Sequence, residues 1–341
     1  MKAVIPICLS LIFWTHQASG HHSFAASFTE DIIQSEGVVS RFVFRNPHVI
    51  IYMDVTDEAG DEVRWMVEGG AATSLRDAGW TNQSIQRGEY LRITGRAGRD
   101  SRPMIQMGTV EVLDPDTRVV LRTPNIARGF GESYAGVVAS IPLTLADGRP
   151  NLTGAWVRGK GGPGFRNHRA PPFNEVGATL QAQWDPADDP QVACENPGLV
   201  RQAGYTPHPV RITQNDDHVI IEYEEYGGRR VIYFDDRDTR DGNNDLIKLG
   251  RSRARYEGAA LVVESTHMPG NPTGTGGNRL SDRTTTVETF RRDDDPEQGP
   301  MVEMEMIIHD PGHLSEPWEM VWKKLYNDDY EFIPVECHTP L

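Results

Sequence analysis

The stretch EGVVSRFVFRNPHVIIYMDVTDEAGDEVRWMVEGG, residues 36–70, decides the fold of the first part of the chain. It holds three short runs dominated by β-branched, aromatic and other apolar residues: Val38–Phe44, Val49–Val55 and Val63–Glu68. Runs of this length and composition predict strands. Between the last two, Asp57–Asp61 is made of turn-forming residues and closes a hairpin. The stretch therefore predicts three consecutive strands.

The region after these strands completes an order that indicates a fold. Ala72–Ala78, followed by Gly79, predicts a short helix that ends at a glycine. Residues 85–95 predict a turn that leads into a fourth strand, and Met104–Leu113 predicts a fifth. Three strands, a helix and two strands is the order of an OB-type barrel, which we expect over residues 21–115. Because such barrels serve many functions, the fold alone predicts no activity.

The rest of the chain predicts a second, larger β domain. Residues 116–146 are rich in Gly, Pro and polar residues and predict a linker, so the second domain takes residues 147–341. Strands are expected at Val210–Thr213, Val219–Glu225, Arg230–Phe234, Leu249–Tyr256, Leu261–Thr266, Thr284–Arg291, Met301–Ile308, Trp318–Tyr326 and Tyr330–Val335. Short turns between them favour an antiparallel meander, either a closed barrel or a sandwich. Gly154 and Trp156, ahead of this meander, are similar to the start of lipocalin-like barrels. The predicted fold class is all-β.

Composition and charge limit the possible functions. The 341 residues are 38% hydrophobic and 24% charged, which is the balance of a soluble globular protein long enough for two domains. The formal net charge of −15 at pH 7 repels phosphate backbones, so nucleic acid is not expected as a partner.

Residues 1–20 predict a secretory signal peptide. Lys2 supplies a positive start, Ala3–Trp14 is an apolar run too short to span a bilayer, and Ala18–Gly20 offers a small-residue cleavage site. No later stretch is apolar for long enough to predict a transmembrane helix. The expected location is therefore the periplasm or the cell exterior.

Two cysteines remain after removal of this leader, Cys194 and Cys337. In an oxidising compartment the simplest expectation is a disulfide between them, which stabilises by a few kcal/mol, order of magnitude only. A catalytic or metal-binding thiol is the alternative. Neither cysteine has a second cysteine or a histidine at the spacing of a ligand pair, although His338 adjoins Cys337.

Histidines near the expected mature terminus suggest a metal site. If cleavage follows Gly20, the free amine and the ring of His21 form a chelate, and His22 or His48 completes a T-shaped copper site. The alternative is a solvated terminus, with His48 capping a strand. A second histidine pair, His309 and His313, has the four-residue spacing of helical zinc sites, but Pro and Gly between them predict a turn.

Polar residues on the predicted strands of the second domain suggest a ligand cavity. Tyr223, Tyr233, Arg253 and His267 could line it, with further polar residues such as Glu288. The alternative is ordinary strand alternation, in which these side chains point to solvent. No Gly-x-Ser-x-Gly elbow is present, so the sequence gives hydrolase chemistry no support.

Spaced motifs in the first domain resemble an uncharacterised family of exported Gram-negative bacterial proteins. The resemblance covers residues 21–115 and implies export and a small OB-like domain, but no activity. The matching pieces are His-His-Ser-Phe-Ala-Ala-x-Phe at 21–28, Asn46-Pro47-His48, Val67-Glu68-Gly69-Gly70 and Gly79-Trp80.

The second domain resembles another uncharacterised exported bacterial family, over about residues 147–338. His267–Arg283 departs from that family, which has an aromatic, Asp-rich loop where this chain has Gly, Pro and Thr. If the loop shapes a pocket, the pocket of this chain differs. The matching pieces are Pro150–Gly154 with Trp156, Cys194 before Pro197-Gly198, Tyr233–Asp235, Gly250 with Ser252, Tyr256–Gly258, Leu261–Glu264, Asp310-Pro311, Pro317-Trp318 and Glu336-Cys337.

These observations favour an exported, non-catalytic protein that binds a small ligand or a metal. An enzyme is the first alternative, either copper-dependent at His21 or an isomerase in the pocket of the second domain. The second alternative is an interaction module of an envelope assembly that uses the OB face.

Overall fold

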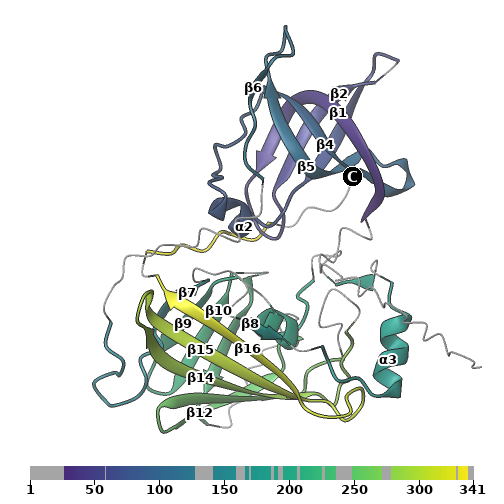
Figure 1. The fold of residues 1–341 in the computed structure, drawn as a ribbon. Helices are drawn as coiled ribbons and strands as arrows, with labels where there is room; N and C mark the ends of the chain where they lie inside the picture. The colour runs from purple at the N-terminus through teal and green to yellow at the C-terminus, as the bar shows by residue number, and fades with distance from the viewer. Residues whose placement is uncertain are drawn as a thin grey trace, which may run out of the picture.

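The computed structural model shows two β-barrels, with an extended segment lying between them (Figure 1). It describes residues 27–57, 59–126, 141–158, 166–168, 170–185, 188–190, 195–205, 208–224, 227–235, 248–270, 278–327 and 329–336. In that part of the chain, no helix has the length and the apolar character needed for a bilayer span.

The first barrel has the strand connectivity that the sequence predicts. Its strands are β1 (Phe28–Val43), β2 (Ile50–Thr56), β3 (Glu62–Glu68), β4 (Tyr90–Gly98), β5 (Met104–Leu113) and β6 (Val120–Arg122). The sheet order is β3-β2-β1-β4-β5-β6, and β3 also pairs with β5 in parallel, which closes the barrel. Helix α2 (Ala72–Asp77) joins β3 to β4 and contributes Leu75 to the core. The OB-type prediction is confirmed.

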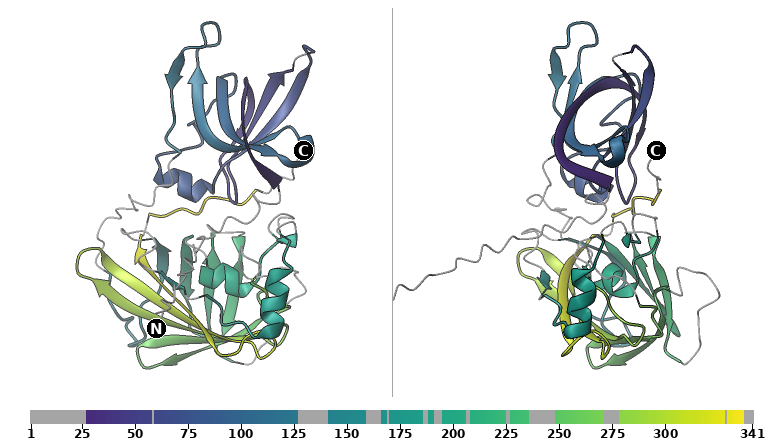
Figure 2. Two further views of the ribbon diagram at one scale, coloured as in Figure 1. Left: turned by 45° about the vertical axis from the view of Figure 1, so that its right-hand side comes forward. Right: turned by 90° about the vertical axis from the view of Figure 1, so that its right-hand side faces the viewer.

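Glycines let the strands of this barrel bend. The long strand β1 curls around the barrel (Figure 2), with a register shift against β2 between Val39 and Arg41. The pairing of β4 with β5 shifts between Thr94 and Gly95. A Cβ atom on Gly95 would lie 1.6 Å from the carbonyl oxygen of Gln106. The bulge therefore requires a residue without a side chain.

The second sheet forms a nearly closed antiparallel barrel. Its strands are β7 (Gly154–Val157), β8 (Arg166–His168), β9 (Val210–Gln214), β10 (His218–Tyr223), β11 (Arg229–Tyr233), β12 (Arg251–Glu257), β13 (Ala260–Thr266), β14 (Thr285–Asp295), β15 (Gly299–His309) and β16 (Trp318–Tyr326). The order is β11-β10-β9-β7-β16-β15-β14-β13-β12, with β8 beside β16. The end strands β11 and β12 lie next to each other without a backbone ladder. The predicted antiparallel meander is confirmed, in its barrel form.

The interior of the second barrel is packed with side chains. Trp156, Phe290, Trp318 and many aliphatic residues form one core. A π-helical segment, Val200–Tyr205, joins this core, because the Trp322 indole donates to the Ala203 carbonyl oxygen at 2.8 Å. The sequence did not predict this segment. It also did not predict the 3₁₀ turn Arg99–Ser101, helix α3 (Glu175–Ala182) or strand β6, which lies within the expected linker.

The predicted strand at Tyr330–Val335 is wrong. Residues 329–336, the C-terminal strap, are extended but form no strand, and they run between the two barrels (Figure 1). Tyr330 and Phe332 pack on Ala155 and Val157 of the second barrel, whereas Ile333 enters the core of the first. The alternating apolar pattern therefore reflects packing on two different surfaces.

Candidate functional site

A buried polar cluster lies inside the second barrel, beside the seam between β11 and β12. Arg230 of β11 donates to Glu288 of β14 with both terminal nitrogens, at 3.0 and 2.7 Å. Both residues are almost fully buried. Arg230 also donates to the hydroxyl of Ser252 on β12 at 2.9 Å, so side chains bridge the seam that the backbone leaves open.

Further hydroxyl groups surround this ion pair. Arg230 donates to Tyr223 and to Ser265, each at 2.9 Å. Burial is the main cause of a raised pKa at the Tyr223 phenol, which therefore stays neutral. Arg230 Nε and the hydroxyl of Thr286 are buried and have no hydrogen-bond partner in the structure. These two groups therefore have unused hydrogen-bonding capacity.

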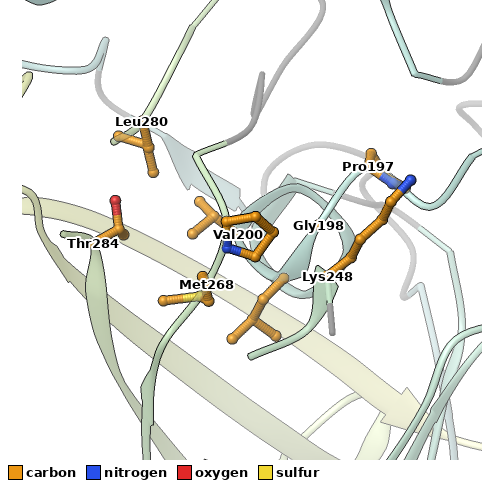
Figure 3. Close-up of a pocket in the computed structure, with 9 residues that line it drawn as sticks. Pro197, Gly198, Val200, Lys248, Met268, Leu280 and Thr284 are labelled. Carbon is orange, nitrogen blue, oxygen red and sulfur yellow. The ribbon is translucent and has the colours of Figure 1, made fainter. Parts of the chain in front are cut away.

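A small pocket opens at one end of the barrel, near the ends of β12, β13 and β14 (Figure 3). The space amounts to roughly 250 Å³, including the part open to solvent. Its enclosed part has room for about one water molecule. The residues of this mouth pocket are Pro197, Gly198, Leu199, Val200, Lys248, Met268, Pro269, Leu280 and Thr284.

The polar groups of the mouth pocket are already engaged. The Lys248 amine forms an ion pair with Glu195, and in Figure 3 it points toward Pro197, away from Thr284. The Thr284 hydroxyl donates to the carbonyl oxygen of Ser281 at 2.7 Å. The pocket therefore offers an apolar surface and shape rather than a reactive group.

Strand β14 connects the mouth pocket with the polar cluster. Thr284, Thr286 and Glu288 alternate with half-buried residues and are themselves buried, so all three point into the barrel. Thr284 lines the pocket, Thr286 has the free hydroxyl, and Glu288 holds Arg230. A polar row therefore leads inward from the pocket.

The structure does not bring the four predicted ligand residues together. Tyr223 points into the barrel and belongs to the polar cluster. Tyr233 is half-buried, and its ring lies 5.2 Å from that of His218. Arg253 is exposed on β12, and His267 is exposed just after β13 with a left-handed φ of 57°. For these three residues the structure agrees with the alternative of solvent-facing alternation.

Sequence reasoning missed the centre of the cluster. The sequence pattern predicts a strand that begins at Arg230, but the charge of this side chain does not indicate that it faces inward. The alternation along the strand does indicate an inward-facing Arg230. Arg230 and Ile232 are two residues apart and so lie on the same face of the strand, and Ile232 is buried. Glu288 was named only as a further lining residue, and it is completely buried.

The predicted metal ligands fall partly outside the described residues. His21 and His22 lie there, as do Cys194 and Cys337, so the copper chelate and the disulfide stay predictions. The third proposed ligand, His48, follows a cis Asn46–Pro47 peptide bond in the loop between β1 and β2.

The surroundings of His48 are polar and largely buried. Its Nδ1 atom lies 3.7 Å from the Glu68 carboxylate and 3.2 Å from the Gly69 carbonyl oxygen. Burial raises the pKa of Glu68, and the charges of His48 and Arg102 partly oppose this rise. Arg102 also donates to the Ser27 carbonyl oxygen at 3.4 Å, where the described chain begins.

The second histidine pair does not form a metal site. His309 is exposed at the end of β15. Nδ1 of His313 lies 2.8 Å from the carbonyl oxygen of Arg279, within hydrogen-bond reach. Over the residues that the structure describes, no group of three or more His, Cys, Asp or Glu side chains is arranged to hold a metal ion.

Comparison with known proteins supports the resemblance of the first domain. Residues 10–106 match a family of unknown function (DUF6152). This match covers most of the first barrel and gives it no activity. No curated protein matches the chain.

Proposed function

We propose that this chain is an exported, non-catalytic binding protein that takes a small, mainly apolar molecule into the mouth pocket. The observation that carries the proposal is an apolar pocket continued by a polar row with a free buried hydroxyl, at Thr286. An apolar wall with a few convergent polar groups is the usual construction of a small-molecule site. Export is supported by the leader sequence of residues 1–20.

Two flexible side chains can enlarge the pocket for a ligand. Met268 is unbranched and adapts its shape at low cost. Lys248 lies along the wall with its aliphatic stem, and its amine can follow Glu195 into solvent. A ligand therefore needs side-chain movement but no change of the barrel.

Substitutions at Lys248 test this pocket. Lys248→Trp should fill the mouth and weaken the binding of small aromatic probes by at least about tenfold, or ~1.4 kcal/mol. Lys248→Met keeps the aliphatic wall and removes only the charge, so it should bind the probes as the wild type does. Indole and p-cresol are suitable probes, followed by ligand-detected NMR. Equal binding by the two variants, or none by the wild type, would contradict the pocket.

Copper binding is a second candidate, favoured by the position of His48. His48 and Glu68 lie 3.7 Å apart. Arg102 links this pair to Ser27, since it acts electrostatically on Glu68 and donates to the Ser27 carbonyl oxygen. Five residues separate His21 from Ser27, and an extended chain of that length reaches roughly 17–20 Å. We infer from this chain length that an N-terminal His21 can approach His48.

The copper candidate is tested on protein exported with its own leader. Mass spectrometry reads the N-terminal residue, and the same sample is titrated with copper. We expect a His21 terminus and one-to-one binding that is lost in His21→Ala and strongly weakened in His48→Ala. Affinity should fall as the pH is lowered, because protons compete for imidazole and for Glu68. The control is His309→Ala, on an exposed residue of β15. A different terminus, or binding that survives His21→Ala, excludes this site.

A further inference from the structure

One carboxylate lies at the junction of the two barrels and is completely enclosed. Glu224 directly follows β10 and is 1% exposed. A buried carboxylate is costly unless several donors compensate the loss of water. The donors around Glu224 therefore determine what its burial depends on.

These donors come from helix α2 and the C-terminal strap, not from β10, which Glu224 follows. The Thr73 hydroxyl of helix α2 donates to Oε2 at 2.9 Å, and Arg76 of the same helix lies 3.5 Å from Oε1. The Tyr330 hydroxyl donates at 2.8–2.9 Å, and the backbone N–H of Ile333 donates at 2.7 Å. Two donors thus belong to the first barrel and two to the C-terminal strap.

The C-terminal strap is anchored on both barrels. On the second barrel, Arg211 donates to the Tyr330 carbonyl oxygen at 2.9 Å and stacks on the Phe332 ring. On the first barrel, Asn46 accepts from the Glu336 N–H at 2.8 Å and donates to the Pro334 carbonyl oxygen at 3.2 Å. An ion pair joins Arg41 to Glu336 at 3.0 Å.

The first barrel also prepares its own side of the junction. Asn46 is fully buried, and its amide donates to the Thr73 hydroxyl at 3.1 Å. This contact orients the hydroxyl that reaches Glu224. Arg76 lies over the Tyr330 ring and also contacts its hydroxyl. The loop before β2 and helix α2 therefore present a matched set of donors to one acceptor.

We propose that Glu224 is a lock that holds the two barrels as one rigid unit, through the donors of helix α2 and of the C-terminal strap. Separation of the barrels removes Thr73 and Arg76 from the carboxylate together, and release of the strap removes the other two donors. The lock therefore couples the separation of the two barrels to the release of the C-terminal strap. Opening it frees the end of the first barrel and withdraws Ile333 from the core of that barrel, while the strands of both barrels stay paired.

Solution scattering and thermal unfolding of the full chain test the lock. The wild type should unfold in one transition, and Glu224→Ala should unfold in two, with a larger radius of gyration before the first of them. The matched control is Glu222→Gln on β10, two residues before Glu224. Glu222 is partly exposed, and its ion pair with Arg229 is 3.8 Å long. This control should keep the single transition and the wild-type dimensions.

Variants on the other side of the junction guard against a simple folding defect. Thr73→Val removes one donor without changing the second barrel, and Ile333→Asp expels the strap from the core of the first. Both should reproduce the two transitions and the larger dimensions. A wild type that already unfolds in two steps contradicts the lock. So do variants that only lower the temperature of a single transition at unchanged dimensions.

Discussion

Replacing Arg230 by Met should lower the free energy of unfolding by about 3–5 kcal/mol, the range found when one partner of a buried ion pair is removed. Glu288 is completely buried and receives two hydrogen bonds from Arg230, so the substitution leaves a carboxylate without its counter-charge. The same change removes the side-chain bridge to Ser252 across the open seam. Urea unfolding followed by tryptophan fluorescence measures the loss.

Two further variants separate charge from shape. Arg230→Met combined with Glu288→Leu removes both charges and should recover most of the lost stability, because an apolar pair can replace a buried ion pair at little cost. Arg229→Met changes the neighbouring residue, which is more than half exposed, and should alter stability by less than about 0.5 kcal/mol. If the double variant were as unstable as the single one, the hydrogen bonds across the seam would account for most of the lost free energy of unfolding.

Gly95→Ala should destabilise the first barrel by more than about 4 kcal/mol, the range of severe local clashes. The added methyl group would lie 1.6 Å from the Gln106 carbonyl oxygen, which is part of the backbone of the neighbouring strand. Gly108, at the same bulge in β5, is also crowded, because a Cβ there would lie 2.5 Å from the Thr94 carbonyl oxygen. Neither strand can move aside without opening the ladder between β4 and β5.

Gly70→Ala is the matched control for this substitution. No atom lies within 4 Å of a Cβ built on Gly70, and the residue precedes helix α2 in the same barrel. The Gly70→Ala variant should therefore unfold at nearly the same urea concentration as the wild type. Amide hydrogen exchange of β4 and β5 would localise the damage in Gly95→Ala. Normal protection of both strands in that variant would refute the role of the bulge.

Strands with a strict local pattern were predictable from the sequence. Met104–Leu113 and Trp318–Tyr326 have the bounds that the sequence indicates. In each of these strands the apolar residues alternate or cluster, and turn residues flank the run. The strand preference of the local sequence therefore agrees with the burial of its side chains in the folded protein. The OB-type barrel followed from the order of elements, three strands, a helix and two strands. The parallel pairing of β3 with β5 that closes this barrel was seen only in the structure.

Segments whose structure depends on distant residues were not predictable. The strap looks like a strand because Tyr330, Phe332 and Ile333 are apolar, but their partners belong to different barrels. The first half of β1 is polar and was missed, since its pairing with β4 fixes it rather than its composition. Tertiary context overrides local preference in both cases.

The candidate site also contains residues that the sequence indicates and residues that it does not. Tyr223 was proposed as a lining residue, with solvent-facing alternation as the alternative, and its side chain is buried in the core of the second barrel. Arg230 was missed because a charged residue on a strand is normally assigned to solvent. Only the placement of Glu288 opposite Arg230, far along the chain, makes its burial possible.

The origin of Ile333 has a consequence for biosynthesis. Ile333 completes the core of the first barrel, and all strands of that barrel leave the ribosome much earlier than Ile333 does. A nascent first barrel without the strap therefore has an uncovered apolar socket, and the backbone N–H and C=O of Asn46 lack their partners Pro334 and Glu336. Until the strap is made, this socket is exposed apolar surface of the kind that promotes aggregation and that chaperones cover.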